Sequence, residues 1–308
     1  MSSYPNSIIL NLNSDRIVNK RSLGTPADCQ SKELYCFTVE NSESVFQIID
    51  GQHRLAGFND SNSTEFDVVV SFFIDLQIED QAYLFSIINL KQTKVSKSHV
   101  YDLFDLSEIR SPQKTAHTIA KTMNRDPDSP FFQRLKLLGM TPKFEGEALY
   151  EAPLTQGMFV DRLLRLISHT PIEDRDASKN REPLRLSGHE VGGGLIFRQF
   201  YAEDKDWAIL KTMNNYFVAV SAHFPKEWAD RSSPLSRTIG YGALLRLLVD
   251  LYQEGVTEKD ISSDFFSRKI RAIRERYEAS ETTINFDSFP AAGSGETKLY
   301  KFLRTLLE

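Results

Sequence analysis

The sequence predicts an α+β protein in which a mixed β-sheet is followed by a helical part. Runs rich in β-branched and aromatic residues lie before residue 75, and the clearest of them is 66–74. After residue 97, apolar residues recur instead at the three- and four-residue spacing of one helix face. This change of pattern predicts two domains, residues 1–106 and residues 107–308.

The first elements follow from local composition. The apolar run 7–12 predicts a strand, whereas 13–34 is polar, contains glycine and proline, and is expected to be a loop. Two further strands are expected at 34–40 and 45–49, with the polar residues 41–44 as a turn between them.

The N-terminal domain is expected to continue with two helices and a strand. A short helix should include 55–58, and 66–74 should form a buried strand because it is almost entirely β-branched or aromatic. Residues 79–89 predict a helix with a largely apolar surface.

The C-terminal part is expected to be helical. Thr155 is a good N-cap residue for one of its helices, and the charged, glycine-rich stretch 171–194 is expected to be a loop. Periodicity predicts helices at 115–124, 131–138, 156–168, 204–222, 235–253, 258–278 and 297–307.

Composition is that of a soluble globular protein, with 41% hydrophobic and 26% charged residues. No apolar run is long enough to span a bilayer, and the N-terminus lacks a basic region followed by an apolar one. We therefore expect a cytoplasmic protein with no membrane partner. A homo-oligomer is compatible with the sequence, which does not determine the oligomeric state.

Cysteine, histidine and net charge narrow the function classes. The two cysteines, Cys29 and Cys36, have no histidine pair at metal-ligand spacing near them, so a zinc site or a disulfide scaffold is not expected. A magnesium ion that arrives with a nucleotide needs few protein ligands and stays compatible. The net charge of −5 argues against a surface that coats DNA non-specifically.

The segment Asp50-Gly51-Gln52-His53-Arg54-Leu55 is the most informative in the chain. It joins an apolar run to a predicted helix, and the first N–H groups of a helix have no intrahelical acceptor. Gly51 lacks a Cβ that would keep a phosphate from the backbone, and His53 and Arg54 add side-chain donors. The pattern predicts a nucleoside triphosphate bound at this turn.

A structural interpretation of the same residues competes with the nucleotide site. Asp50 could be the N-cap of the helix, and Arg54 its ion-pair partner four residues later. His53 would then be a polar residue on the exposed side. Gly-turn motifs are common, and spacing alone does not separate the two interpretations.

The stretch 50–58 resembles the signature of the DGQHR-domain proteins, which include DndB-type regulators of DNA phosphorothioation clusters. That family is distantly similar to ParB-type partition proteins and sulfiredoxins, in which a Gly-x-x-Arg turn at a helix start holds nucleotide phosphates. The resemblance implies a ParB/sulfiredoxin-like fold for the N-terminal mixed sheet. It assigns Gly51, Gln52, His53 and Arg54 to phosphate binding.

A second segment, 88–98, resembles the family's Asn-x-x-Gln block and would form the other wall of the site. The resemblance assigns Asn89, Lys91, Gln92 and Lys94 to binding. Ile88 and Gln92 replace the Glu and the Arg of the ParB pattern, which is a departure from its chemistry. Without the resemblance, these residues are equally typical of a solvated helix end that favours lysine.

The resemblance implies a nucleotide-binding protein, with ATP and Mg²⁺, that acts in a DNA-modification or phage-defence system. Asp50 and His53 are the candidate catalytic residues if the nucleotide is hydrolysed, with Asp50 orienting magnesium or an attacking water. Hydrolysis stays open because binding needs only donors, whereas turnover needs a positioned base. In similar proteins a segment like 5–10 follows a further strand and helix, so the N-terminus is expected to be incomplete.

Two alternatives remain. Residues 267–277 are the most basic segment, and Arg271 and Arg274 share a helix face, so the protein could be a DNA-binding transcriptional regulator. The same face could equally be solvated and balanced by nearby acids. In the second alternative, the protein is an interaction module whose nucleotide site has decayed.

Two further motifs give only weak indications of function. The turn 292–298 departs from the phosphate-loop spacing, so it predicts a plain helix start, although a similar turn in related proteins would close over the N-terminal site. Ser187–Glu190 lacks a nucleophile-elbow pattern, and a catalytic triad there is rejected.

Overall fold

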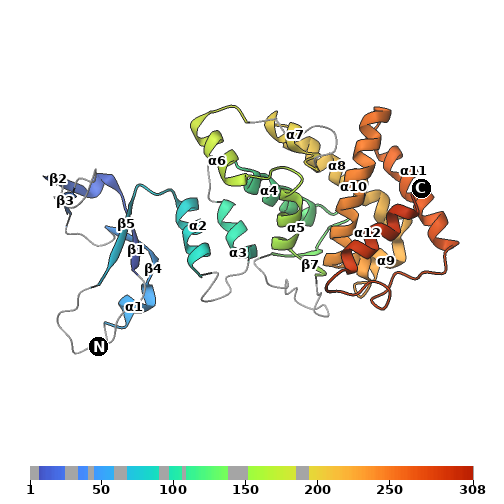
Figure 1. Ribbon diagram of the computed structural model, residues 1–308, viewed down its shortest axis with the longest axis horizontal. Coiled ribbons are helices and arrows are strands. Elements are labelled where there is room, and N and C mark those ends of the chain that lie inside the picture. Colours follow the sequence, from blue (N-terminus) through green and yellow to red (C-terminus); the bar gives the residue numbers. More distant parts are fainter. Residues whose placement is uncertain are drawn as a thin grey trace. The chain divides into compact units, whose positions relative to one another are not determined.

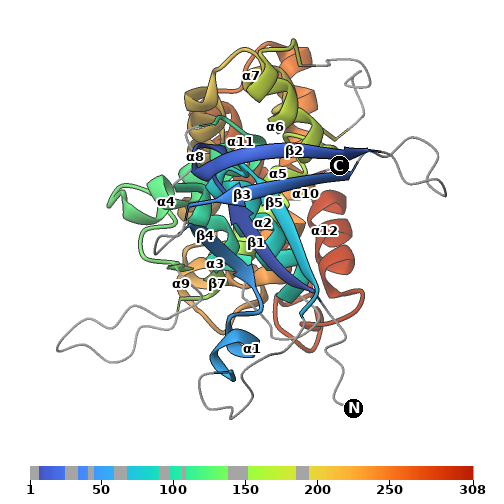
Figure 2. The ribbon, with the colours of Figure 1, turned by 90° about the vertical axis from the view of Figure 1, so that its left-hand side faces the viewer.

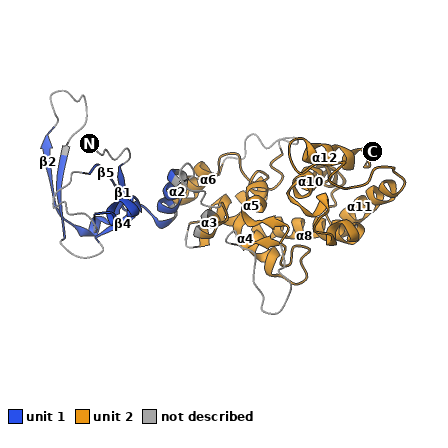
Figure 3. Ribbon diagram, turned by 90° about the horizontal axis from the view of Figure 1, so that it is seen from below, with its two compact units in different colours: residues 1–95 blue, residues 96–308 orange. Residues whose placement is uncertain are grey.

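The computed structural model describes residues 7–24, 34–40, 45–58, 68–89, 97–105, 109–137, 152–184 and 194–307. The chain divides into two compact units, unit 1 with residues 1–95 and unit 2 with residues 96–308 (Figure 3). Unit 1 contains a mixed sheet and unit 2 is mostly helical, which confirms the predicted α+β class. In the part of the chain that the structure describes, no helix has the length and apolar character that crossing a membrane requires.

Unit 1 is built on a three-stranded sheet with the order β4-β1-β5 (Figure 2). The central strand β1 runs antiparallel to β4 and parallel to β5, and β2 pairs with β3 in a separate antiparallel ribbon. The elements of unit 1 are β1 (Ile8–Leu12), the 3₁₀ turn η1 (Ser14–Arg16), β2 (Ile17–Gly24), β3 (Leu34–Val39), β4 (Phe46–Asp50), α1 (Gln52–Ala56), β5 (Val70–Ile74) and α2 (Ile78–Asn89).

A buried amide network fixes α2 on the sheet. Asn11 on β1 is 1% exposed; its amide nitrogen donates to the side-chain oxygen of Gln47 at 3.0 Å, and its oxygen accepts from the N–H of Leu76 at 2.9 Å. Gln81 on α2 donates to the same Gln47 oxygen at 2.7 Å. The polar residue in an apolar strand is therefore satisfied by β4 and by the start of α2.

Three expectations for unit 1 were wrong. Residues 13–34 contain the strand β2, whose side chains are mostly exposed, so no apolar alternation marks it in the sequence. The strand β3 pairs with β2, whereas β4 pairs with β1, so the two predicted strands are not neighbours. The predicted turn 41–44 lies outside the described residues.

The third wrong expectation is that residues 66–74 form a buried strand. Its described part, β5, is an edge strand, and Phe72 is 44% and Ile74 51% exposed. Phe72 packs edge-on against Phe37 of β3 at 6.0 Å and against Phe46 of β4 at 5.5 Å between ring centres. Hydrophobicity predicted the strand, but a small three-stranded sheet leaves this strand partly uncovered.

Unit 2 is a helical assembly in which α10 packs against α12, and α8 packs against α11 (Figure 1). Its helices are α3 (Lys97–Asp102), α4 (Pro112–Arg125), α5 (Gln156–Leu164), α6 (Pro171–Asn180), α7 (Arg198–Ala202), α8 (Asp206–His223), α9 (Pro225–Ala229), α10 (Thr238–Glu258), α11 (Ser263–Glu278) and α12 (Gly295–Thr305). The 3₁₀ turns η2 (Leu103–Asp105) and η4 (Pro234–Ser236) and the short parallel strands β6 (Leu135–Lys136) and β7 (Leu154–Thr155) complete it.

The core of unit 2 is centred on Phe131, which is fully buried. Its ring meets the rings of Phe217 and Phe159 edge-on at 4.7 and 5.1 Å, and it also contacts Trp228 and Tyr241. Edge-to-face aromatic pairs contribute about 0.5–1.5 kcal/mol each beyond the area they bury. These contacts join α5, α8, α9 and α10 around one side chain.

The helix predicted at 131–138 does not form. Asn124 holds this stretch in another conformation, because its side-chain oxygen accepts from the N–H of Leu135 at 2.8 Å and its carbonyl accepts from that of Gln133 at 3.0 Å. Gln133 adopts a φ of 52°, outside the helical range. The chain then enters β6.

The loop predicted at 171–194 is also wrong in its first part, which forms α6. This helix begins with proline in the first turn, carries Glu173 and Asp174 there, and ends at Arg181 in the left-handed conformation. Helix α7 was not predicted either. Thr155 does cap α5, since its hydroxyl accepts from the N–H of Met158 at 3.2 Å.

Candidate functional site

The predicted phosphate turn forms the junction between β4 and α1. Asp50 ends β4 and is paired with Ile9 of β1, and Gly51 follows with φ 101° and ψ 7°. Few residues other than glycine adopt this conformation without strain. Gly51 is also the N-cap of α1, so the N–H groups of Gln52 and His53 point out of the first helical turn.

Arg54 folds back over Gly51 and contacts Asp50. Its Nη2 lies 2.8 Å from Asp50 Oδ2 and 3.3 Å from the carbonyl oxygen of Ser7, and both charged side chains are mostly buried, at 23% and 14% exposed. A Cβ added at Gly51 would lie 3.2 Å from the same Nη2. The guanidinium therefore lies directly against the glycine of the turn.

Five of the predicted residues are thus placed together, and the side chains of the other four are not described. Asp50, Gly51 and Arg54 are in contact, whereas Gln52 and His53 are exposed beside them. Asn89 is the last residue of α2, and its side chain is not described. Lys91, Gln92 and Lys94 lie outside the described residues.

The ion pair between Asp50 and Arg54 is the contact that the structural interpretation requires, four residues apart on one helix start. The N-cap is Gly51 rather than Asp50, and no side chain accepts a hydrogen bond at this helix start. The arrangement therefore leaves the first N–H groups of α1 without a side-chain cap. An anion at this position would receive backbone donors and the edge of a guanidinium.

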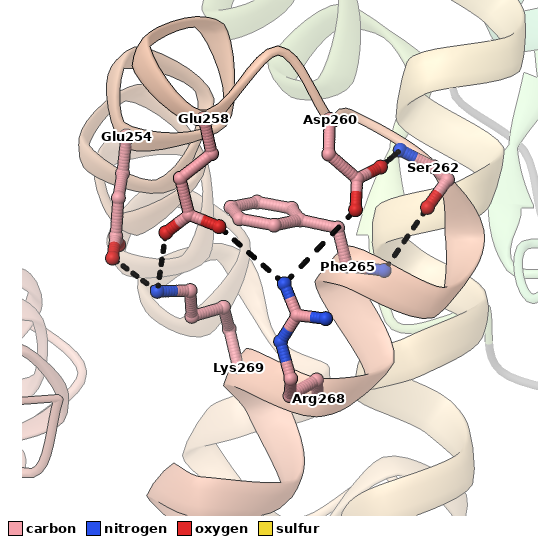
Figure 4. A network of polar contacts seen from close by, with 7 residues as sticks. All are labelled: Glu254, Glu258, Asp260, Ser262, Phe265, Arg268 and Lys269. Atoms are coloured by element: carbon pink, nitrogen blue, oxygen red, sulfur yellow. Dashed lines mark hydrogen bonds and ion pairs between the residues drawn. The ribbon is translucent and has the colours of Figure 1, made fainter.

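Helix α11 contains the predicted basic segment, and its cations face acidic residues of unit 2. Lys269 contacts Glu254 and Glu258, and Arg268 lies 3.4 Å from Glu258 (Figure 4). Ser262 caps the helix through the N–H of Phe265 at 3.2 Å. This corner between α10 and α11 is a charge-balanced network.

The other end of α11 is balanced in the same way. Arg274 binds Glu227 of α9 through both carboxylate oxygens, at 2.9 and 3.1 Å, and Glu278 at 2.8 Å. Arg276 donates to the carbonyl oxygens of Leu306 and Leu307 near the end of α12. Arg271 is exposed. The structure thus favours the interpretation of a basic face balanced by acids over a bare phosphate-binding face.

The glycine-rich turn 292–298 belongs to the packing of unit 2. Glu296, in the first turn of α12, forms a bidentate pair with Arg162 of α5, and a Cβ added at Gly242 of α10 would lie 2.5 Å from both side chains. The turn starts a helix, as the sequence predicted. Ser187–Glu190 lies outside the described residues.

Sequence reasoning missed a buried polar cluster in unit 2. His117 on α4 is fully buried; its Nδ1 accepts from the amide nitrogen of Gln156 at 2.9 Å, and its Nε2 lies 2.9 Å from Asp105. The Gln156 nitrogen also donates to Asp102 at 3.0 Å, and Lys121 pairs with Asp105. Because an amide nitrogen only donates, this geometry fixes a neutral His117 with its proton on Nε2.

The cluster predicts a pH-dependent stability of unit 2. Burial lowers the pKa of His117 below its ordinary 6.5, although Asp105 opposes the shift. The unfolded state therefore binds more protons just below pH 6.5, so the free energy of unfolding should fall as the pH drops through this range. Urea denaturation at pH 7.5 and 5.5 should show this loss in the wild type and a smaller one in His117→Gln.

The effects of two other titratable groups, His223 and Asp105, must be distinguished from that of His117 in this measurement. Burial also lowers the pKa of His223, so His223→Gln serves as the control and should keep most of the pH-dependent loss. Burial raises the pKa of Asp105, but Lys121 and His117 outweigh this effect and lower that pKa below its ordinary value. Asp105 therefore titrates at a pH below the two that are compared. An equal pH-dependent loss in the wild type and His117→Gln would contradict the prediction.

No family model, curated protein or solved structure matches the chain.

Proposed function

We propose that unit 1 binds the phosphate groups of a nucleoside triphosphate, ATP, at the turn 50–54. The observation that carries the proposal is the left-handed Gly51 between β4 and α1, with the guanidinium of Arg54 against it. Gly51 itself is buried and packs against Ile8 and Arg54, so the donors that a ligand can meet are the uncapped N–H groups at the start of α1. The exposed side chains of Gln52 and His53 add further donors beside these N–H groups.

The Asp50 carboxylate lies at the same turn and fits a role beside a bound cation. It neutralises Arg54 in the free protein, so a phosphate would compete with it for the guanidinium. Mg²⁺ bound to a nucleotide prefers carboxylate and phosphate oxygens and keeps several waters, so Asp50 is a suitable ligand for it. Among the described residues, no group of three or more His, Cys, Asp or Glu could hold a metal ion, so phosphate oxygens and waters would supply most of the ligands of the Mg²⁺.

The second wall of the site is proposed from the resemblance to DGQHR-domain proteins. It consists of Asn89 with Lys91, Gln92 and Lys94, which follow α2 directly in the chain. In the same proposal, the sheet of unit 1 is a ParB/sulfiredoxin-like nucleotide-binding fold. Its mixed pairing, with β1 between an antiparallel and a parallel neighbour, is compatible with that assignment.

The proposed biological role is in a DNA-modification or phage-defence system, as the resemblance implies. If the nucleotide is hydrolysed, Asp50 and His53 are the proposed catalytic residues. Asp50 supplies a carboxylate acceptor at the turn, and His53 supplies an exposed imidazole. A carboxylate could orient water, and an imidazole could transfer a proton. Activity therefore needs a separate phosphate-release measurement.

Isothermal titration of the full chain with ATP and Mg²⁺ tests the proposal. We expect saturable binding, and we expect added inorganic triphosphate to compete because the turn recognises phosphates. The absence of binding in a folded protein would overturn the nucleotide proposal. It would favour the interpretation in which unit 1 is an interaction module.

The alternative of a DNA-binding regulator predicts a specific salt effect for α11. Because Arg274 is held by Glu227 and Glu278, we expect Arg271→Ala combined with Arg274→Ala to leave the salt dependence of any DNA binding unchanged. If both residues contacted phosphates, the slope of log K against log salt would fall by about two units. Fluorescence anisotropy with labelled duplex DNA at several salt concentrations decides between the outcomes, with Arg271→Ala alone as the comparison.

A further inference from the structure

We propose that a cavity between α4 and α8 in unit 2 binds a nucleobase, as part of a nucleoside or nucleotide. This cavity, of about 230 Å³, is lined by the last turn of α4, the turn after it and one face of α8. The site is separate from the turn proposed for phosphate binding and does not depend on it. The residues that line it are Thr122, Met123, Asp126, Ser129, Trp207, Leu210, Lys211 and Asn214.

Trp207 supplies the stacking surface. Its side chain is 63% exposed, whereas Trp228, the other tryptophan of the chain, is 8% exposed and lies in the core. Trp207 lies in the first turn of α8, and Leu210, Lys211 and Asn214 follow on the same face at helical spacing. An exposed indole at the rim of a cavity offers a flat apolar surface that a base can cover.

Asn214 lines the cavity and carries an unused acceptor. Its Oδ1 is buried and receives no hydrogen bond from any described residue. A buried acceptor without a donor is costly, so a rotation of the Asn214 side chain that lets its oxygen meet a donor in the cavity is favourable. The exocyclic amine and ring N–H groups of nucleobases are donors of this kind.

The charged rim favours a nucleoside over other planar ligands. Lys211 is exposed and has no ion-pair partner among the described residues, so it can meet a phosphate. Asp126, the C-cap of α4, can accept from the hydroxyls of a ribose. An aromatic peptide side chain would use Trp207 but would leave the Lys211 ammonium without a counter-charge.

Fluorescence titration with adenosine, cytidine, guanosine and uridine tests the proposal, because nucleosides carry no phosphate for the turn in unit 1. Binding should quench the emission of exposed Trp207. Asn214→Leu removes the acceptor but keeps the indole, and we expect about a five- to tenfold loss of affinity. Asn215→Leu, one residue further on α8 and outside the cavity lining, should bind as the wild type does.

Two further variants complete the test. Trp207→Ala should weaken binding about tenfold or more when it is followed by calorimetry. Lys211→Gln should weaken binding of AMP but not of adenosine. The proposal is overturned if no nucleoside quenches the emission, if Asn214→Leu and Asn215→Leu behave alike, or if N-acetyltyrosinamide binds while nucleosides do not. Arg54→Ala should keep wild-type nucleoside binding, because the cavity contains no residue of the turn in unit 1.

Discussion

Arg198→Leu is expected to lower the free energy of unfolding of unit 2 by about 3–5 kcal/mol. The Arg198 guanidinium donates to both carboxylate oxygens of Asp174, with 2.7 Å from Nη2 to Oδ1, and Ser168 donates to the same carboxylate. The two charged side chains are 5% and 7% exposed. Removing the arginine leaves a carboxylate buried without its counter-charge, which costs far more than the pair itself contributes.

Urea denaturation of Arg198→Leu measures this loss. Lys205→Ala is the matched control, because Lys205 and Glu203 form an ion pair with both side chains largely exposed, and its loss should change stability by less than about 1 kcal/mol. Combining Arg198→Leu with Asp174→Leu should recover part of the stability by removing the unpaired charge. A loss below about 1 kcal/mol in Arg198→Leu would contradict the account.

The same pair explains why α6 is not predictable from its own residues. Residues 171–180 are rich in charge, and a surface loop was the simplest interpretation. The helix forms because Asp174, in its first turn, meets Arg198, which is 24 residues away. Periodicity cannot predict a helix that is held by a buried ion pair rather than by an apolar face.

Where apolar periodicity is strong, the helices were predicted well. Both α10 and α12 bury leucines at helical spacing, and the predicted ranges 235–253 and 297–307 overlap them. The stretch 131–138 has similar apolar content but does not form a helix. Asn124 accepts hydrogen bonds from two of its backbone N–H groups, and Phe131 is buried in the core. Such contacts depend on tertiary structure and leave no periodic signal in the sequence.

The polar sites also differ in how far they could be predicted from the sequence. The turn at Gly51 was predictable because strand, glycine and helix are adjacent in the chain, and its contacts span four residues. The His117 cluster was not predictable, since its members come from α3, η2, α4 and α5. The Asn11 network was not predictable for the same reason, because Gln47 and Gln81 are distant from Asn11 in the sequence.

The prediction with the largest effect on function concerns Arg54→Ala. If Arg54 contacts a phosphate, the variant loses charge-assisted hydrogen bonds of roughly 1.5–3 kcal/mol, which is about a ten- to hundredfold loss of ATP affinity. Arg54→Lys should recover only part of it, because an ammonium cannot reproduce the planar fork of a guanidinium. Isothermal titration with ATP and Mg²⁺ on the three proteins measures these differences.

Retained ATP affinity separates the structural interpretation from the phosphate site. If Arg54 serves only its pair with Asp50 and its hydrogen bond to Ser7, Arg54→Ala should lose about 1–3 kcal/mol of stability, because the pair is mostly buried, and should keep its ATP affinity. Arg16→Ala is the matched control in unit 1, because Arg16 pairs with Glu40 at 2.9 Å away from the turn and should not affect binding. Circular dichroism establishes that each variant is folded. Wild-type ATP affinity in a folded Arg54→Ala protein would exclude Arg54 from the phosphate site, and the turn would then be a structural feature of unit 1.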